Sequence, residues 1–502
     1  MMNIPVIPVA TIKNANRGIE MVDNKDVKDL LFYERKNIWK EISEDQVTAI
    51  NQFSENYKSF LNECKTEREC VKYIHNLCLS KENSFISLKS AYKNKQQLHP
   101  GDKLYYIENN KAVVLITIGK EGLSQGIKLI GSHIDSPRLD LKPLPLFEDS
   151  ELGFLKTHYY GGVRKYQWVT IPLALHGIIY KSDGTEVEIC IGENDSDPVF
   201  VIPDLLPHLA AEQNKLTLKD AIPGENLNLL TGSVPNADTE VSEKVKATIL
   251  QLLNNKYGIT EKDFINAELE AVPALKARDV GIDKSFLGAY GHDDRVCAYT
   301  SLMAFFESSN TINDKTCFCY FSDKEEIGST GNTGAQCDTM TYVTEMIAEL
   351  LDVSETKEKS HLNIKGVFRD SVMLSADVTA AFDPNHKSVF ESNNAAFINR
   401  GIAICKYTGS GGKGGASDAN AEFLNSITKL FDQSEDIVWQ IAELGKIDVG
   451  GGGTIAKFAA ALGINVLDAG VPLLSMHAPY ELASKADIYM TYKAFKAFYE
   501  NL

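Results

Sequence analysis

The spacing of apolar residues divides the first part of the chain into two kinds of segment. Between residues 25 and 80, apolar positions recur every three or four residues with dense charge between them, which predicts amphipathic helices over 27–42 and 44–64. From Lys103 onward the pattern changes to that of strands. Residues 103–120 predict a β-hairpin that turns at Asn109-Asn110, and a further apolar strand follows over 126–135. The first part of the chain is therefore predicted to pass from helices to a sheet.

Helical and strand patterns alternate in the last part of the chain. Helices are predicted over 295–309 and 341–353, and apolar strands over 315–321 and 371–377. Alternation of this kind requires crossover connections and favours a parallel sheet that is covered by helices. We therefore predict an α/β fold with a mostly parallel central sheet.

Residues 138–280 have a different character from the segments on either side. They are β-rich with frequent turn residues, and they include one amphipathic helix over 243–258. We interpret them as a domain inserted between two parts of a catalytic domain, residues 1–137 and 281–502. The alternative is that they form one more layer of the same domain. Residues 159–177 carry more apolar side chains than a small solvated appendage would expose, which favours a role of the insert in assembly.

Length and charge limit the possible functions. A chain of 502 residues predicts at least two domains, and its net charge of −17 disfavours binding to nucleic acid or to anionic membranes. We find no apolar stretch long enough to span a bilayer and expect no signal peptide. The nine cysteines are scattered and form no CxxC pair, which is typical of a reducing compartment. The cytoplasm is therefore the expected location.

Acidic and histidine side chains follow several of the predicted strands. Glu325 and Glu326 come directly after the strand over 315–321, and similar clusters occur elsewhere in the chain: His133 with Asp135, Asp293 with Asp294, Asp377, and His477. Each cluster alone is more often a turn or a helix cap. Since ligands bind at the carboxyl ends of parallel strands, the shared pattern predicts one site. Histidine with carboxylates and without cysteine suits hydrolytic Zn²⁺, Mn²⁺ or Co²⁺ chemistry, so the residues predict a two-metal hydrolase.

The motifs SHIDSPRLDLKP, GHDDR, DKEEIGS, LSADVTAAFDPN and LLSMHAPYE resemble those of the aspartyl aminopeptidase and aminopeptidase I family, in the family's order from about residue 75 to the C-terminus. The resemblance implies a metalloaminopeptidase that acts on peptides with a free N-terminus and holds two divalent metals, with zinc expected. It further implies an insert that mediates assembly of a homododecamer. The resemblance implies that Asp293 bridges the two metals, that His133 and Asp377 complete one metal site, and that Glu326 and His477 complete the other. It also implies that Asp135 orients His133 and that Glu325 is the general base.

One departure from the family pattern affects specificity. The eukaryotic aspartyl-specific branch has a histidine and a charged run after YGG, where this chain has Tyr166 and residues 170–172 (Thr-Ile-Pro). The chain therefore resembles the bacterial aminopeptidase I branch, and its preference for acidic or for other N-terminal residues stays open. Lys406 and Lys165 are candidate substrate-binding residues, and Lys165, Tyr166 or Gln167 is a candidate to reach the metal site of a neighbouring subunit.

Three alternative functions follow from the same residues. A related two-metal amidohydrolase, such as a deacylase or a carboxypeptidase, would use the same ligands on a different amide. A scaffold that had lost turnover would not need Glu325. The glycine-rich segment 408–423 contains Gly409, Gly411 and Gly414 in a G-x-G-x-x-G pattern, but it lacks the βαβ unit with an acidic residue that dinucleotide binding requires. The aminopeptidase is the function that we favour.

Overall fold

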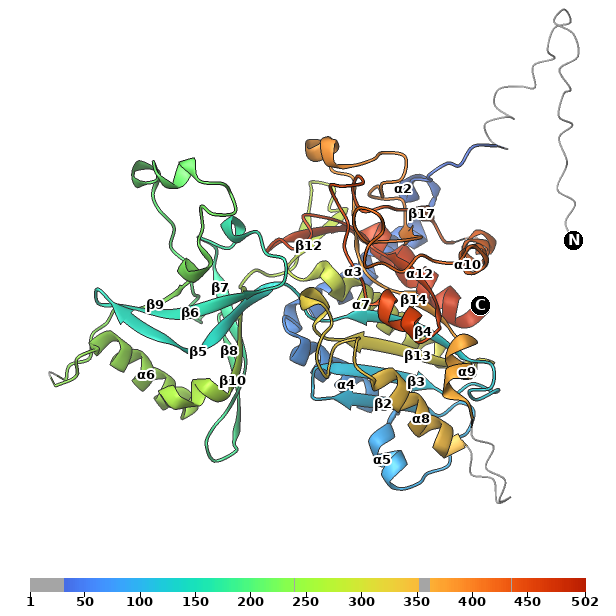
Figure 1. The fold of residues 1–502 in the computed structure, drawn as a ribbon, viewed down its shortest axis with the longest axis horizontal. Helices are drawn as coiled ribbons and strands as arrows, with labels where there is room; N and C mark the ends of the chain where they lie inside the picture. The colour runs from blue at the N-terminus through green and yellow to red at the C-terminus, as the bar shows by residue number, and fades with distance from the viewer. Residues whose placement is uncertain (1–30, 239, 352–361, 435) are drawn as a thin grey trace, which may run out of the picture.

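A nine-stranded sheet forms the centre of the larger lobe (Figure 1). The computed structural model describes residues 31–238, 240–351, 362–434 and 436–502. The strands of this sheet lie in the order β1 (Ile86–Ser87), β2 (Lys103–Glu108), β3 (Ala112–Thr117), β13 (Thr316–Ser322), β4 (Ile127–His133), β14 (Val372–Ser375), β18 (Asn465–Gly470), β16 (Ile402–Cys405) and β17 (Trp439–Ile441). The central strands β13, β4, β14 and β18 run parallel, whereas β3 and β16 are antiparallel to their central neighbours. The mostly parallel α/β fold is confirmed.

Helices cover both faces of this sheet. In β13, Cys317, Cys319 and Phe321 point into one apolar core, whereas Phe318 and Tyr320 point into the other, as the two-residue period of a strand requires. A sheet buried on both faces needs continuous apolar strands, and every residue of β3, β4 and β13 is buried. The first core is closed by α3 (Glu44–Glu63), α4 (Glu67–Leu79), α7 (His292–Ser308), α10 (Ala421–Gln433) and α12 (Lys485–Asn501), and the second by α5 (Leu88–Lys93), α8 (Thr339–Leu351), α9 (Ile364–Arg369) and α11 (Ala456–Ala461).

A second, antiparallel sheet forms the narrower lobe at the left of Figure 1. Its strands come only from residues 138–273, in the order β8 (Glu186–Ile191), β7 (Leu173–Tyr180), β10 (Ala267–Pro273), β5 (Arg138–Asp149), β6 (Leu152–Tyr160) and β9 (Leu229–Gly232). Helix α6 (Lys244–Tyr257) packs on β5, β6 and β9 and contributes Val245 and Ile249 to a separate apolar core. This core gives the second sheet its own source of stability.

A third sheet lies beside the metal-ligand loops. It consists of β11 (Arg278–Val280), β12 (Phe286–Ala289), β20 (Glu481–Ser484), β19 (Pro472–Leu474) and β15 (Thr379–Ala380). Residues 278–280 thus pair with β12 of the third sheet rather than with the second sheet. None of the helices within the described ranges is long and apolar enough to cross a bilayer.

Local sequence signals account for most of these elements. The predicted hairpin is present, and both turn residues, Asn109 and Asn110, have the positive φ angles that asparagine tolerates. The predicted helix over 243–258 is present as α6 and ends at Gly258 with a φ of 67°. The described part of helix α8 reaches Leu351, and the last two residues of the prediction over 341–353 lie outside the described residues.

The predicted helix over 27–42 is wrong for most of its described length. Residues 27–30 lie outside the described part, Leu31 is helical, residues 32–37 are not, and the chain becomes helical again in α2 (Ile38–Glu41). The side chain of Asn37 accepts a hydrogen bond from the Trp39 backbone N–H at 3.1 Å and so begins the helix at Ile38. Before this cap the chain follows the surface, where the Tyr33 ring lies 6.0 Å from the Trp439 ring. These tertiary contacts outweigh helix propensity.

Candidate metal centre

Loops that follow neighbouring strands carry the candidate metal ligands. His133 is the last residue of β4, Glu325 and Glu326 lie in the 3₁₀ turn η6 (Glu325–Ile327) just after β13, and Asp377 follows β14. Because β13, β4 and β14 are adjacent and parallel, their carboxyl ends bring these residues to one edge of the sheet. Asp293 lies at the start of α7, and His477 follows β19 of the third sheet.

The Asp293 carboxylate lies between two imidazoles. Its Oδ1 is 3.2 Å from His133 Nε2, and its Oδ2 is 2.9 Å from His477 Nε2. Asp293 and His133 are buried, and His477 is about a third exposed. One carboxylate with its two oxygens directed at two different histidines is the arrangement expected of a ligand shared by two metal ions.

The remaining acidic side chains surround the same pair of histidines. Glu326 Oε1 is 3.4 Å from His477 Nε2, Asp377 Oδ1 is 3.9 Å from His133 Nε2, and Glu325 Oε2 is 4.0 Å from His133 Nε2. Potential ligand atoms lie within 4.8 Å of one another in three overlapping groups, which together contain His133, Asp293, Asp294, Glu325, Glu326 and Asp377. The structure thus brings all five candidate ligands and the candidate base into one cluster.

The charge of this cluster fits divalent cations. Burial, together with the charge of neighbouring Asp293, raises the pKa of Glu326 well above its usual range, and burial and nearby Asp294 do the same to the pKa of Asp377. Glu326 Oε1 is buried and accepts no hydrogen bond from any residue that the structure describes. A bound cation would offset the repulsion between these carboxylates and would give Glu326 Oε1 a partner. Imidazole nitrogens and carboxylate oxygens are ligands that zinc accepts.

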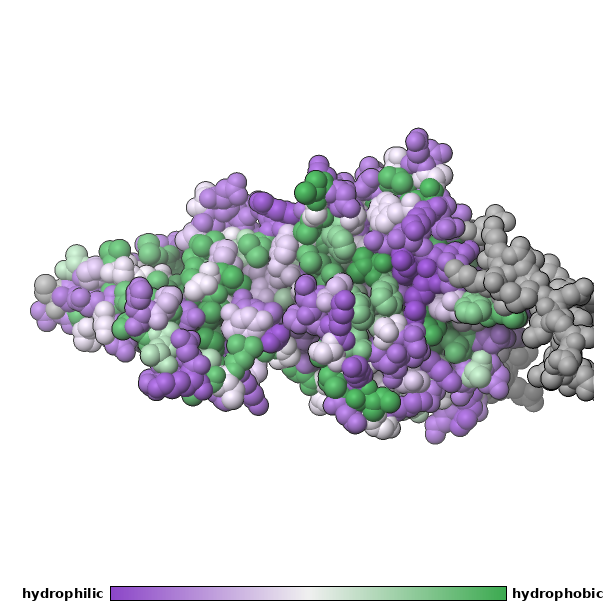
Figure 2. All heavy atoms as spheres, turned by 90° about the horizontal axis from the view of Figure 1, so that it is seen from above, coloured by the Kyte–Doolittle hydropathy of each residue, from purple (hydrophilic) through white to green (hydrophobic). Residues whose placement is uncertain are grey.

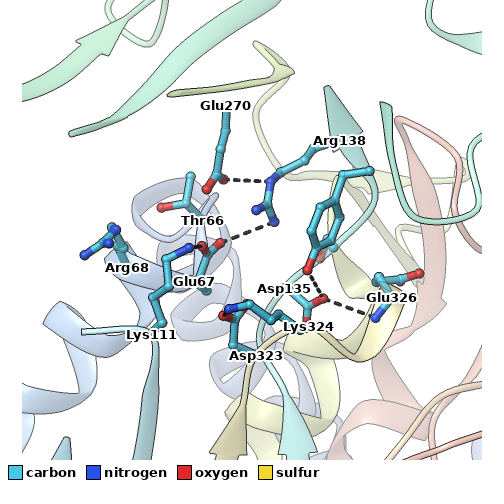
Figure 3. A network of polar contacts seen from close by, with 12 residues as sticks. Thr66, Glu67, Arg68, Lys111, Asp135, Arg138, Glu270, Asp323, Lys324 and Glu326 are labelled. Atoms are coloured by element: carbon cyan, nitrogen blue, oxygen red, sulfur yellow. Dashed lines mark hydrogen bonds and ion pairs between the residues drawn. The ribbon is translucent and has the colours of Figure 1, made fainter. Parts of the chain in front are cut away.

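Asp135 fixes the loop that carries the two glutamates. Its Oδ1 lies 3.3 Å from His133 Nδ1 and accepts a hydrogen bond from the Glu325 backbone N–H at 3.1 Å. Its Oδ2 accepts one from the Glu326 backbone N–H at 3.2 Å, as Figure 3 shows, and one from the Tyr160 hydroxyl at 2.9 Å. Burial opposes protonation of His133, but its contacts with Asp135 and Asp293 raise its pKa well above the usual value.

Sequence reasoning missed Glu481, the first residue of β20. Its Oε1 accepts a hydrogen bond from the His477 backbone N–H at 2.7 Å, and its Oε2 accepts one from the Asp293 backbone N–H at 3.1 Å. This buried carboxylate therefore ties together two loops that carry candidate ligands. Its signals in the sequence are its place four residues after His477 and its position at the end of the motif LLSMHAPYE, and neither by itself distinguishes it from a surface glutamate.

A cavity of about 300 Å³ opens beside the cluster. Its walls include Glu325, Glu326 and His477 on one side and Thr454, Lys457 and Phe458 on another. Lys457 is exposed and was not among the predicted substrate-binding residues. Lys406, exposed just after β16, and Lys165, in the 3₁₀ turn η1 (Lys165–Gln167), do not line this cavity in the described part of a single chain.

Comparisons with known proteins place the chain in a family. The aminopeptidase I zinc metalloprotease (M18) profile matches residues 60–499. A probable M18 family aminopeptidase 1 from Clostridium acetobutylicum is 46% identical over 471 residues, which cover 94% of this chain and 99% of the relative.

Solved structures agree with the sequence matches. The crystal structure of an M18 aminopeptidase from Thermotoga maritima has a TM-score of 0.86 at 42% identity and covers 94% of this chain and 100% of its own. That of aminopeptidase I from Clostridium acetobutylicum has a TM-score of 0.85 at 45% identity, with the same coverage. This chain therefore belongs to the aminopeptidase I zinc metalloprotease family, M18, and is a metal-dependent aminopeptidase.

Proposed function

We propose that this aminopeptidase removes the N-terminal residue of peptides by means of two divalent metal ions, with zinc as the expected metal. Asp293 would bind both ions, His133 and Asp377 would complete one site, and Glu326 and His477 would complete the other. The observation that carries this proposal is the position of the Asp293 carboxylate, whose two oxygens face two different imidazoles at 3.2 and 2.9 Å. When bound, such a pair of ions lowers the pKa of water and stabilises negative charge on the carbonyl oxygen of the substrate.

Glu325 is the general base in this proposal. Burial raises the pKa of Glu325 to about 7, and the carboxylate borders the cavity beside the cluster. A carboxylate with a pKa near neutrality accepts a proton from the attacking water and returns it to the leaving amine. The net reaction adds one water across the peptide bond and leaves Glu325 ionised again. Asp135 holds the Glu325 backbone N–H, so the position of this base depends on a neighbour that takes no part in the proton transfer.

The substrate would be a peptide with a free α-amine, whose first side chain enters the cavity beside the cluster. Phe458 and Lys457 lie on the same wall of this cavity. The wall therefore offers both an apolar and a cationic surface, and both neutral and acidic N-terminal residues remain candidates.

A panel of aminoacyl-anilides tests the reaction class. The proposal predicts that metal-loaded protein hydrolyses anilides with a free α-amine and leaves the N-acetylated forms intact. Cleavage of the acetylated forms at comparable rates would identify a deacylase-like amidohydrolase instead. Comparison of leucyl with aspartyl and glutamyl anilides within the same panel gives the preferred N-terminal residue.

We further propose that residues 138–280 are an inserted assembly domain and that twelve chains form the working enzyme. The second sheet has its own apolar core, and β11 pairs with β12 of the third sheet, so within the predicted range the insert itself would end shortly before residue 278. Apolar side chains are exposed along its long connection between β8 and β9, and Figure 2 shows hydrophobic surface over this narrower lobe. The exposed side chains are Leu205, Leu206, Leu209, Leu216 and Leu218.

A distant relative supports the number of chains. The mApe1 of S. cerevisiae has been solved as a dodecamer, and it matches this fold with a TM-score of 0.71 at 22% identity. The mass of the metal-loaded protein, measured by light scattering, tests the assembly.

A further inference from the structure

The buried carboxylate of Asp135 receives its hydrogen bonds from two different sheets. Three of the groups around it belong to loops of the central sheet: the His133 imidazole and the backbone N–H groups of Glu325 and Glu326. The fourth is the hydroxyl of Tyr160, the last residue of β6 in the second sheet, which donates to Asp135 Oδ2 at 2.9 Å. The second sheet thus contributes one contact directly behind the candidate metal centre within a single chain.

Tyr160 is itself held by Arg138. The Arg138 guanidinium lies 3.9 Å from the centre of the Tyr160 ring, close enough for a cation–π contact. Arg138 is 3.3 Å from Glu67 and 3.2 Å from Glu270, and Figure 3 shows these ion pairs together with Asp135 and Glu326. Glu67 and Glu270 are buried, so the guanidinium has little freedom to move. The position of the Tyr160 ring is therefore set by a network that joins α4 to the second sheet.

The loop after β13 makes backbone hydrogen bonds of its own, such as that from the Gly328 N–H to the Glu325 carbonyl at 2.8 Å, but the N–H groups of the two glutamates are held by Asp135. Lys324 has a φ of 66° and Gly328 a φ of 94°, so the chain is in left-handed conformations on both sides of Glu325 and Glu326. Both glutamates direct a backbone N–H at Asp135, which makes that carboxylate their common anchor. A rotation of Asp135 would displace the candidate base and a candidate ligand together.

We propose that Tyr160 is a positioning residue of the aminopeptidase, which acts by fixing the Asp135 carboxylate and through it the loop of Glu325 and Glu326. This inference rests on the roles proposed above for those two glutamates. Residues that hydrogen-bond to the ligands of a metal, without binding the metal themselves, typically account for about 10–100-fold in metal affinity or activity. The second sheet would then have a role in catalysis within its own chain, in addition to its proposed role in assembly.

The substitution Tyr160→Phe removes the hydroxyl and keeps the ring that packs against Arg138. We expect kcat to fall about tenfold with little change in KM, because the base and one ligand lose their position while the substrate cavity keeps its walls. We also expect the dissociation constant for Zn²⁺, measured in competition with a chelator, to rise about tenfold. The midpoint of thermal unfolding should stay within a few degrees of the wild-type value, since the buried ring remains.

Tyr159→Phe is the matched control. Tyr159 precedes Tyr160 in β6, its side chain is exposed, and its hydroxyl makes no hydrogen bond to any residue in the described ranges. This variant should keep wild-type kcat and zinc affinity. If Tyr160→Phe also keeps both values, or if its losses only accompany unfolding, the inference is wrong. If the wild-type protein itself cleaves no peptide, the proposed function fails, whereas the zinc affinities of the two variants still test the role of Tyr160.

Discussion

The backbone N–H of Glu325 donates a 3.1 Å hydrogen bond to Asp135 Oδ1. His133 Nδ1 lies 3.0 Å from the Asp135 backbone carbonyl and 3.3 Å from Oδ1, so this one residue positions both a candidate metal ligand and the candidate base. The side chain of Glu325 is left free to border the cavity, where a substrate would lie. The base is therefore positioned through its main chain, and its carboxylate remains available for proton transfer.

Replacement of Glu325 by glutamine tests the role of the base. The side chain keeps its shape but no longer accepts a proton, so we expect kcat to fall by about 10²–10⁴-fold. Zinc content, measured by elemental analysis, should equal that of the wild type, because the proposed ligand sets do not include Glu325. A variant with full zinc content and near-normal kcat would remove Glu325 from the mechanism.

Asp293→Ala tests the shared ligand. Because the carboxylate faces both His133 and His477, its loss should release both ions, and zinc content should fall to near zero per chain. Asp314→Ala is a suitable control, since Asp314 is highly exposed and pairs only with Lys120 among the described residues. If one zinc ion stays tightly bound to Asp293→Ala, the bridging ligand must be another residue.

The sequence predicts the cluster of candidate residues because each member lies at a strand end, follows a strand or lies at the start of a helix, and the family resemblance supplies the individual roles. His133 ends β4, and Glu326 and Asp377 come just after β13 and β14; these three strands are parallel neighbours in the sheet, so their carboxyl ends meet at one edge. No local pattern marks Tyr160, whose contact with Asp135 depends on how the second sheet packs against the first. The same limit applies to Lys457, whose place on the wall of the cavity depends on how α11 packs beside the cluster.

The error over residues 27–42 has a related physical cause. Helical spacing predicts a helix wherever apolar residues recur every three or four positions. In this segment Leu31 and Phe32 are exposed, the Tyr33 ring lies beside the distant Trp439, and the Asn37 cap begins the short helix α2 only at Ile38. The periodicity of the sequence therefore could not predict contacts between residues that lie far apart along the chain.

The protonation of His176 should make the free energy of unfolding depend on pH. This buried imidazole lies 2.7 Å from Glu69 and 3.0 Å from Glu193, and although burial opposes protonation, these carboxylates raise its pKa to about 9. Its pKa in the unfolded chain is about 6.5. The charged form therefore adds stability that is fully present below about pH 6.5 and is lost as the pH rises through about 9, on the order of 3 kcal/mol in total.

Thermal unfolding of His176→Gln measures this contribution. The difference in unfolding midpoint between the wild type and the variant should be largest at pH 6, should shrink between about pH 6.5 and 9, and should stay small above pH 9. His386→Gln is the control for the substitution itself, because the His386 side chain is largely exposed. A difference between the wild type and His176→Gln that stays constant from pH 6 to pH 10 would mean that His176 is neutral in the folded protein.

Leu209→Glu tests the assembly. Leu209 is 68% exposed in the single chain and lies on the long connection of the second sheet. If this surface is covered in a homo-oligomer, a buried charge there should reduce the mass measured by light scattering and reduce activity with it. Ile282→Glu introduces the same charge at an exposed position outside the second sheet and should leave the mass unchanged. A Leu209→Glu variant of wild-type mass would exclude this surface from the interface.

The most direct test of the two-metal account is a zinc titration of the metal-free protein with hydrolysis of leucyl-anilide as the readout. Asp293 faces both histidines, and Glu326 and Asp377 supply further oxygens to the same cluster. The account predicts that zinc binding saturates at two ions per chain, that activity reaches its maximum only as the second ion binds, and that the N-acetylated substrate stays intact throughout. Full activity with a single ion bound per chain would contradict it.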